Sequence, residues 1–212
     1  DVDKQLTREE SKSFGANLLW RNPYIEEIRE LSRSGNLDFN KKVIGTFQLL
    51  KQKFSWNGEY KLYSENLDKV LKTGTGSNAD LNFIFIGMLK SFGIKAYPVV
   101  MSRRSAGMLP VSFPSLQKLN TFVVAIYDEV KGKYVYLDGS MDIPALNVLP
   151  VELSVTKARI LSADIPENKK WVNLQEIPTN QIFMKISANA QGSQITGRRT
   201  TILKGHDALG YR

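Results

Sequence analysis

Residues 81–92 constrain the fold most, because this segment is apolar at almost every position. A loop rich in glycine, threonine and serine at 73–77 precedes it and Gly93 follows it, so both ends of a helix are marked. Asn78 is a good N-cap residue, and Asp80 favours the positive end of the helix dipole. A helix with so little polar surface has to be covered by other elements, which predicts a central, buried helix.

The chain before this segment has the pattern of helices with one apolar face. Asn22-Pro23 predicts a helix start, apolar residues follow at helical spacing, and Gly35 predicts the end. Residues 39–54 carry a similar apolar stripe, and a shorter helix is predicted at 64–72. The N-terminal part is therefore predicted to be helical.

Short runs of β-forming residues follow the buried helix. Pro98 predicts an irregular or edge position for the first run, and a turn at 130–133 joins the other two as a hairpin. The order of the elements predicts an α+β fold, in which the buried helix packs on an antiparallel sheet. The three predicted strands are 94–101, 121–127 and 134–137.

The character of the sequence changes near Trp171. Residues 181–190 and 194–203 are predicted to form two polar strands on either side of Gly192. We interpret them as the opening of a second β-rich region that is cut short. The predicted domains are residues 1–170, a core with N-terminal helices, and residues 171–212, the start of a C-terminal β-rich domain. Because the first residue is Asp1, we expect a processed or partial chain without its targeting segment.

The composition excludes several classes of chemistry. The chain has 212 residues, enough to bury a core without disulfides, and it contains no cysteine, so disulfides and thiolate metal sites are excluded. A single histidine, His206, and scattered carboxylates give no metal-ligand spacing, so neither a metal nor another cofactor is expected.

The charge of the chain predicts a solvated basic surface and no specific nucleic-acid site. The formal net charge is +8, but the basic pairs lie far apart in the sequence. There is no basic run and no aromatic–basic ribonucleoprotein motif, so nucleic-acid binding is not expected. No window approaches the roughly 18 apolar residues that a membrane-spanning helix needs, so no transmembrane segment is expected.

Four short segments follow one another at characteristic places in the predicted elements. They are Gly76-Ser77-Asn78-Ala79-Asp80, Gly93-Ile94-Lys95-Ala96, Asn120-Thr121-Phe122-Val123 and Leu137-Asp138-Gly139-Ser140. Their order and spacing resemble those of the transglutaminase-like superfamily, which has a papain-like cysteine-protease fold and whose catalytic helix begins with Gly-x-Cys-x-Asp. The match covers roughly residues 40–162, and it looks closest to a subset in bacterial envelope proteins that lies between two β domains.

The resemblance implies a degenerate catalytic triad. The family's cysteine falls on Asn78, its histidine on Thr121 and its aspartate on Asp138, so only the aspartate keeps its residue type. In the family a thiolate at a helix N-terminus attacks an acyl carbon, and the aspartate orients the imidazole that serves as base. An amide and a hydroxyl cannot take these roles, so the resemblance predicts a framework without its covalent chemistry.

Each of these positions also has a structural interpretation. Asn78 serves as a helix cap, Thr121 as an ordinary strand residue and Asp138 as a turn former. Trp56 matches an aromatic residue that precedes the catalytic helix in the family; it lines a groove or packs in the core. The predicted binding residues are Trp56, Ser77, Asn78, Asp80, Thr121 and Asp138.

The expected function is that of a catalytically inactive binding or scaffolding module in a periplasmic or envelope protein. Its partners would be a peptide or glycan-linked ligand in the old cleft, bordered by the loop 102–118, and flanking β domains of the same protein. The alternative is an acyl-transfer or peptidase-type hydrolase with a substituted nucleophile. Ser77 and Ser140 flank the relevant positions, and a lysine or His206 would have to act as the base.

Overall fold

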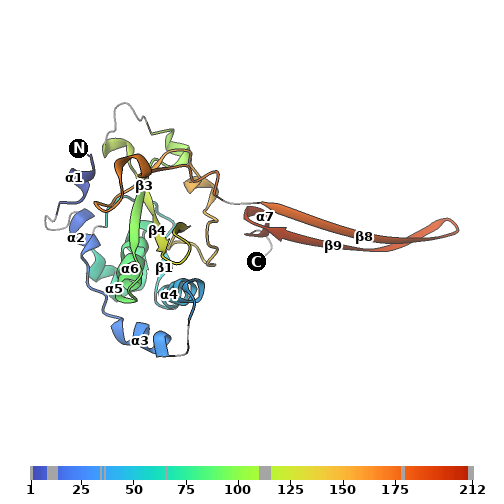
Figure 1. Cartoon of the computed structure of the whole chain (residues 1–212), viewed down its shortest axis with the longest axis horizontal. Coiled ribbons are helices and arrows are strands. Elements are labelled where there is room, and N and C mark those ends of the chain that lie inside the picture. Colours follow the sequence, from blue (N-terminus) through green and yellow to red (C-terminus); the bar gives the residue numbers. More distant parts are fainter. Residues whose placement is uncertain are drawn as a thin grey trace.

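A computed structural model describes residues 2–8, 14–33, 35, 37–64, 66–109, 116–177 and 180–209. Helices and an antiparallel sheet form the main body, and a long hairpin extends from it (Figure 1), which confirms the predicted α+β fold. The prolines at 110 and 114 in the loop 102–118, and Ser115, lie outside the described residues.

The central helix is α6, Asn78–Ser91, and it is buried along its length as predicted. The predicted cap was wrong by one residue. Ser77 is the N-cap, and its side chain accepts from the Asp80 backbone while the Asp80 carboxylate accepts from the Ser77 backbone. This reciprocal capping box satisfies the first free amides of the helix. Asn78 is therefore the first helical residue, and its side chain is free for contacts elsewhere.

Three of the N-terminal helices pack on α6. The predicted helix at 39–54 is confirmed as α4, Phe39–Lys53, with Asp38 as its N-cap. Two predicted starts were wrong, because asparagine side chains form turns there: Asn22 accepts from the Tyr24 amide before α3, and Asn66 caps α5. The remaining helices of this part are α1 Val2–Leu6, α2 Phe14–Leu18, α3 Ile25–Arg33 and α5 Leu67–Thr73.

The main sheet has five strands in the order β5-β4-β3-β6-β7, and all neighbours are antiparallel. The predicted hairpin of the second and third strands is confirmed as β4 and β5. Short 3-10 turns occur at Arg104–Ala106, Leu116–Lys118, Val151–Leu153 and Glu167–Lys169. The strands are β3 Ala96–Met101, β4 Thr121–Asp128, β5 Lys133–Leu137, β6 Ala158–Ile160 and β7 Trp171–Val172.

The edge position predicted from Pro98 was wrong, because β3 lies in the middle of the sheet. Its pairing with β6 begins only at Val99, and the carbonyl of Pro98 accepts from the Leu161 amide just beyond the end of β6. A proline without an amide hydrogen is tolerated here because no strand continues opposite it on that side.

Both faces of the sheet are buried. One face packs on α6 and the surrounding helices, with Val100, Phe122 and Val124 in that core. The opposite face, with Val99 and Val123, is covered by the connections before β6 and on either side of β7, which contribute Leu149, Leu153, Val155, Ile165 and Leu174. Because neighbouring residues of a strand point to opposite faces, the continuous apolar runs of β3 and β4 follow from this double burial.

A small parallel pairing lies beside the start of α6. β1, Ser55–Trp56, pairs with β2, Thr75–Gly76, so the chain just after α4 lies next to the capping residues of α6. An added Cβ at Gly76 would lie 2.9 Å from side-chain atoms of both Asp80 and Val70. A glycine is therefore needed where β2 passes the helix start.

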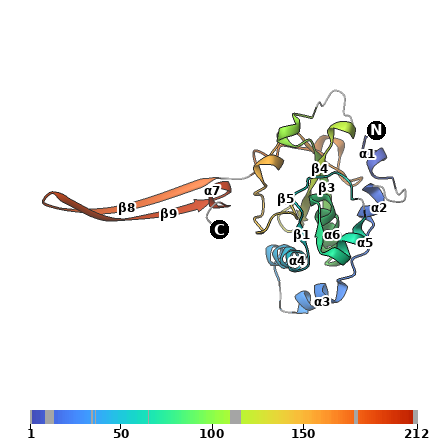
Figure 2. The same cartoon turned by 180° about the vertical axis from the view of Figure 1, so that it is seen from behind.

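The C-terminal strands form a separate two-stranded hairpin, as predicted. β8, Gln181–Gln191, pairs with β9, Gln194–Lys204, over their whole length around Gly192. Figures 1 and 2 show from both sides that this hairpin extends away from the main body. The helix α7, His206–Leu209, follows, and Nε2 of His206 lies 2.7 Å from the carbonyl oxygen of Leu149.

Two points on domain organisation follow from the described residues. β7 belongs to the five-stranded sheet, so Trp171 and Val172 pack with the core, while the boundary between the proposed domains stays a prediction. Within the described part of the chain, no helix has the length and apolar character that crossing a bilayer requires.

The core and the hairpin are expected to respond differently when a large apolar side chain is replaced by alanine. Phe83 is 1% exposed, and Phe83→Ala should lower the free energy of unfolding by about 3–5 kcal/mol because it leaves a cavity. Ile186 is 65% exposed, and Ile186→Ala should change it by less than about 0.5 kcal/mol. Urea unfolding measures both values. A similar loss for both variants would show that the hairpin is packed against something in the isolated chain.

Candidate functional site

Asn78 joins three segments of the chain at the N-terminus of α6. Its Oδ1 accepts from the Lys61 amide at 2.7 Å, and its Nδ2 donates to Thr121 Oγ1 at 2.6 Å and to the Phe122 carbonyl at 3.2 Å. The amide thus uses its oxygen and both of its hydrogens. The sequence-predicted pair of Asn78 and Thr121 is in direct contact.

Thr121 lies at the start of β4, opposite Met101 in the register with β3. Its Oγ1 accepts from Asn78 Nδ2, so the side chain reaches the N-terminal end of α6. Asn78, Thr121 and Asp138 are each 0% exposed. A ligand therefore reaches these three side chains only if the surrounding segments move.

Asp138 joins the site through a residue that the sequence interpretation did not single out. Nδ2 of Asn82 donates to Asp138 Oδ1 at 2.9 Å and to the Phe122 carbonyl at 2.7 Å, and its Oδ1 accepts from the Gly139 amide at 2.6 Å. Asn82 lies one helical turn after Asn78 and shares its face. A second asparagine four residues along an otherwise apolar helix was the signal for this role.

The close approach of the chain after β5 to α6 depends on Gly139. An added Cβ there would lie 3.1 Å from Asn82 Oδ1 and 3.2 Å from the Leu81 backbone. A larger residue there would be packed more tightly than usual against the helix backbone, so the segment or the helix would have to shift slightly and the hydrogen bonds of Asn82 would be disturbed.

Burial dominates the electrostatics of Asp138. Loss of water raises the pKa of this carboxyl to about 6, although hydrogen bonds from Ser140 and Asn82 and the charge of Lys51 oppose the change. The Ser140 hydroxyl donates to the second carboxylate oxygen, Oδ2. Burial in turn lowers the pKa of Lys51, whose Nζ lies 3.8 Å from Asp142 Oδ1.

Ser77 and Asp80 pair with each other. Asp80 Oδ2 accepts from the Ser77 amide at 2.8 Å and from the Ser77 hydroxyl at 2.7 Å. Asp80 Oδ1 is buried without a hydrogen-bond partner in the described residues, and both side chains line a recess of about 230 Å³. This recess is polar and borders Asn57, Lys61 and Lys69.

Trp56 packs beside the site. Its indole Nε1 donates to the Glu59 carbonyl at 3.0 Å, and its ring centroid lies 5.0 Å from that of Tyr60. Trp56 is half-buried against the main core, and β1 places it next to Gly76, two residues from Asn78. The indole therefore supports the segment that carries the Lys61 amide.

The hydroxyls considered as replacement nucleophiles donate to carboxylates. Ser77 donates to Asp80 and Ser140 donates to Asp138, while the ring of His206 is engaged by the Leu149 carbonyl. A carboxylate acceptor orients a hydroxyl, but a lysine or histidine base is what normally activates serine. Within the residues that the structure describes, no group of three or more His, Asp or Glu side chains could hold a metal ion.

Comparison with known proteins found similarity to solved structures only. No protein-family model and no curated protein matches the chain. The chain is similar to a solved structure of a candidate protease from Parabacteroides distasonis, with 17% identity, a TM-score of 0.51 and coverage of 76% of this chain and 29% of that chain. A candidate cysteine protease from Cytophaga hutchinsonii gives 11% identity, a TM-score of 0.38 and coverage of 61% and 43%.

These similarities concern the fold. The core is an α+β core of the papain-like type, which confirms the predicted fold class. This chain spans less than a third of the Parabacteroides protein and less than half of the Cytophaga protein, so their activities are not transferred with the fold.

Asn78→Ala should destabilise the protein more than the exchange of an exposed polar side chain does. The variant leaves the Lys61 amide and the Phe122 carbonyl with fewer partners in a buried place, so we expect a loss of about 2–3 kcal/mol in the free energy of unfolding. Urea unfolding measures it, with the exposed Asn40→Ala on α4 as the matched control. A loss below about 0.5 kcal/mol, the range of ordinary surface exchanges, would contradict this role of the amide.

Asp138 should make stability depend on pH in a specific direction. Its folded-state pKa of about 6 exceeds the ordinary value of 3.8, so the folded protein holds the proton more tightly than the unfolded chain. Lowering the pH from about 6.5 to about 4.5 should therefore stabilise the wild type by up to about 2 kcal/mol relative to Asp138→Asn. Urea unfolding at several pH values measures the difference, and parallel pH profiles for the two proteins would refute it.

Proposed function

We propose that this chain is a catalytically inactive transglutaminase-like domain that serves as a binding or scaffolding module in a larger bacterial envelope protein. The observation that carries the proposal is the 2.6 Å hydrogen bond between Asn78 and Thr121, at the positions that match the family's cysteine and histidine. A contact between these two positions is what a thiolate and its imidazole base would require.

The chemistry of the two side chains supports the absence of covalent catalysis. Asn78 offers no nucleophilic atom for acyl transfer near neutral pH, and its amide groups are already hydrogen-bonded to Lys61, Thr121 and Phe122. Thr121 has no lone pair basic enough to act as a general base. The hydrogen bonds convert the reactive pair of the family into a structural link between helix and sheet.

The hairpin β8–β9 supports a role within a larger assembly. The register places Ile182, Met184, Ile186 and Ile195 on one face, where Arg199 is the only charged residue. All four apolar side chains are more than half exposed, and two strands alone are at most marginally stable in water. A flanking β domain that packs on this apolar face would supply the missing cover.

A ligand of the cleft that corresponds to the family's active site would bind beside the buried positions 78, 121 and 138. The polar recess at Ser77 and Asp80 also borders Asn57, Lys61 and Lys69. Amide and hydroxyl groups of a peptide or glycan-linked ligand would form hydrogen bonds with these polar side chains. The envelope location rests on the family resemblance alone.

The alternative, a hydrolase with a substituted nucleophile, has weaker support. Ser77 and Ser140 donate to carboxylates, and neither hydroxyl is paired with a lysine or histidine base among the described contacts. A fluorophosphonate probe that labels either serine would favour this alternative over the proposal.

The double variant Asn78→Cys with Thr121→His tests the positional assignment. The chain has no other cysteine, so every thiol signal reports on this position. Imidazole contact and the helix N-terminus should lower the pKa of the new thiol well below its ordinary value of about 8.5. Titration of the thiolate ultraviolet absorbance measures the pKa, and hydrolysis of acyl substrates is compared with that of the parent chain, for which we expect none.

Asn78→Cys alone is the matched control, because its thiol is equally buried but lacks the imidazole. Its pKa should exceed that of the double variant, because only the helix N-terminus remains to oppose the effect of burial. Equal thiol pKa values in the single and double variants would contradict the assignment of Thr121 to the position of the family's catalytic histidine. Turnover of acyl substrates by the parent chain would overturn the proposal that the domain is inactive.

A further inference from the structure

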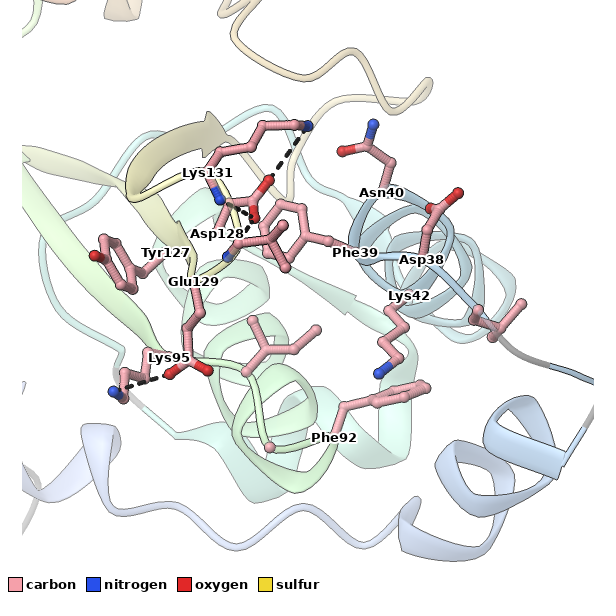
Figure 3. A pocket seen from close by; sticks show the side chains of 14 residues that line it. Asp38, Phe39, Asn40, Lys42, Phe92, Lys95, Tyr127, Asp128, Glu129 and Lys131 are labelled. Carbon is pink, nitrogen blue, oxygen red and sulfur yellow. Dashed lines mark hydrogen bonds and ion pairs between the residues drawn. The ribbon is translucent and has the colours of Figure 1, made fainter.

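A pocket of about 500 Å³ lies at the opposite end of α6 from the Asn78 site (Figure 3). It borders Phe92 and Gly93 at the helix C-terminus, roughly 20 Å from Asn78 at 1.5 Å per residue. Its volume falls within the range of small-molecule sites. We call it the Lys42 pocket; it is lined by Leu37, Asp38, Phe39, Asn40, Lys42, Phe92, Gly93, Ile94, Lys95, Tyr127, Asp128, Glu129, Val130 and Lys131.

The inner wall of the Lys42 pocket is apolar. Phe39 comes from the start of α4, Phe92 from the end of α6, and Ile94 from the segment that leads into β3. A Cβ added at Gly93 would meet no atom within 4 Å, so the space beside the chain between Phe92 and Ile94 is open. An apolar group of a ligand would lose water on entering this space.

Most charges around the rim are already paired. Lys95 Nζ lies 2.9 Å from Glu129, Lys131 Nζ lies 3.3 Å from Asp128, and both pairs are drawn as dashed lines in Figure 3. Asp38 Oδ1 accepts from the amide that follows Asn40, as the N-cap of α4. Glu129 and Asp128 are therefore paired with lysines, and Asp38 is hydrogen-bonded to a backbone amide.

Lys42 is the exception. Its ammonium lies over the Phe92 ring, 5.6 Å from the centroid, and among the described residues it forms no ion pair with a carboxylate. Figure 3 shows its side chain directed across the pocket toward Phe92. A half-buried cation on an aromatic surface, next to an apolar wall, favours an anion that carries an apolar group.

We infer that the Lys42 pocket binds small carboxylates with an aromatic or branched apolar body. The carboxylate would pair with the Lys42 ammonium, and the body would cover Phe39, Phe92 and Ile94. This pocket shares no residue with the Asn78 site, so the inference does not depend on the proposed function.

Titration with 3-phenylpropionate and with its neutral amide tests the inference. Both compounds present the same ring, and only the acid can form the charge-assisted contact, so the acid should bind at least about fivefold more tightly. Amide chemical-shift changes in ¹⁵N-labelled protein report the affinity and should concentrate on residues that line the pocket. Lys42→Met should abolish the preference for the acid while weak binding of the amide persists.

Lys41→Met is the matched control, because Lys41 is exposed on the same helix and does not line the pocket. It removes the same charge from a protein of net charge +8, and the preference for the acid should remain. Equal affinity for acid and amide, an equal loss in both variants, or no saturable shift for the acid would each overturn the inference.

Discussion

Hydrogen bonds from two asparagines of α6 hold the buried helix to the sheet. Asn78 and Asn82 lie one turn apart, and both donate to the carbonyl of Phe122 on β4. Buried amides are tolerated only when their donors and acceptors are paired, and here the partners come from the segment before α5, from β4 and from the chain after β5. These contacts fix the register of the helix against strands that apolar packing alone would leave free to slide.

The same hydrogen bonds agree with the proposal of an inactive domain. A catalytic cysteine and histidine would need access to substrate, whereas an amide and a hydroxyl that bond each other can be fully buried. Asp138 is held by Asn82 and Ser140. Burial raises the pKa of this carboxyl, so the interior contains an acid with no histidine among its partners in the described residues.

Particular residues show where interpretation of the sequence succeeds and fails. The apolar run 81–92 and the stripe of 39–54 predicted α6 and α4, because helical periodicity is local. Pro98 was misleading, because whether a strand lies at an edge depends on where β6 ends, which no neighbouring residue reveals. Asn82 was overlooked for the same reason: its partners at 122, 138 and 139 are far away in sequence.

The sequence by itself determined the helices α4 and α6, the hairpin of β4 and β5, the burial of the central helix and the absence of thiol chemistry. These properties depend on residue types and local spacing. Only the tertiary structure decided that Ser77 rather than Asn78 caps the helix, that Asn78 meets Thr121, and that Lys42 faces an open apolar pocket. Each of these depends on distances between segments remote in sequence, and such distances are set by packing of the whole core.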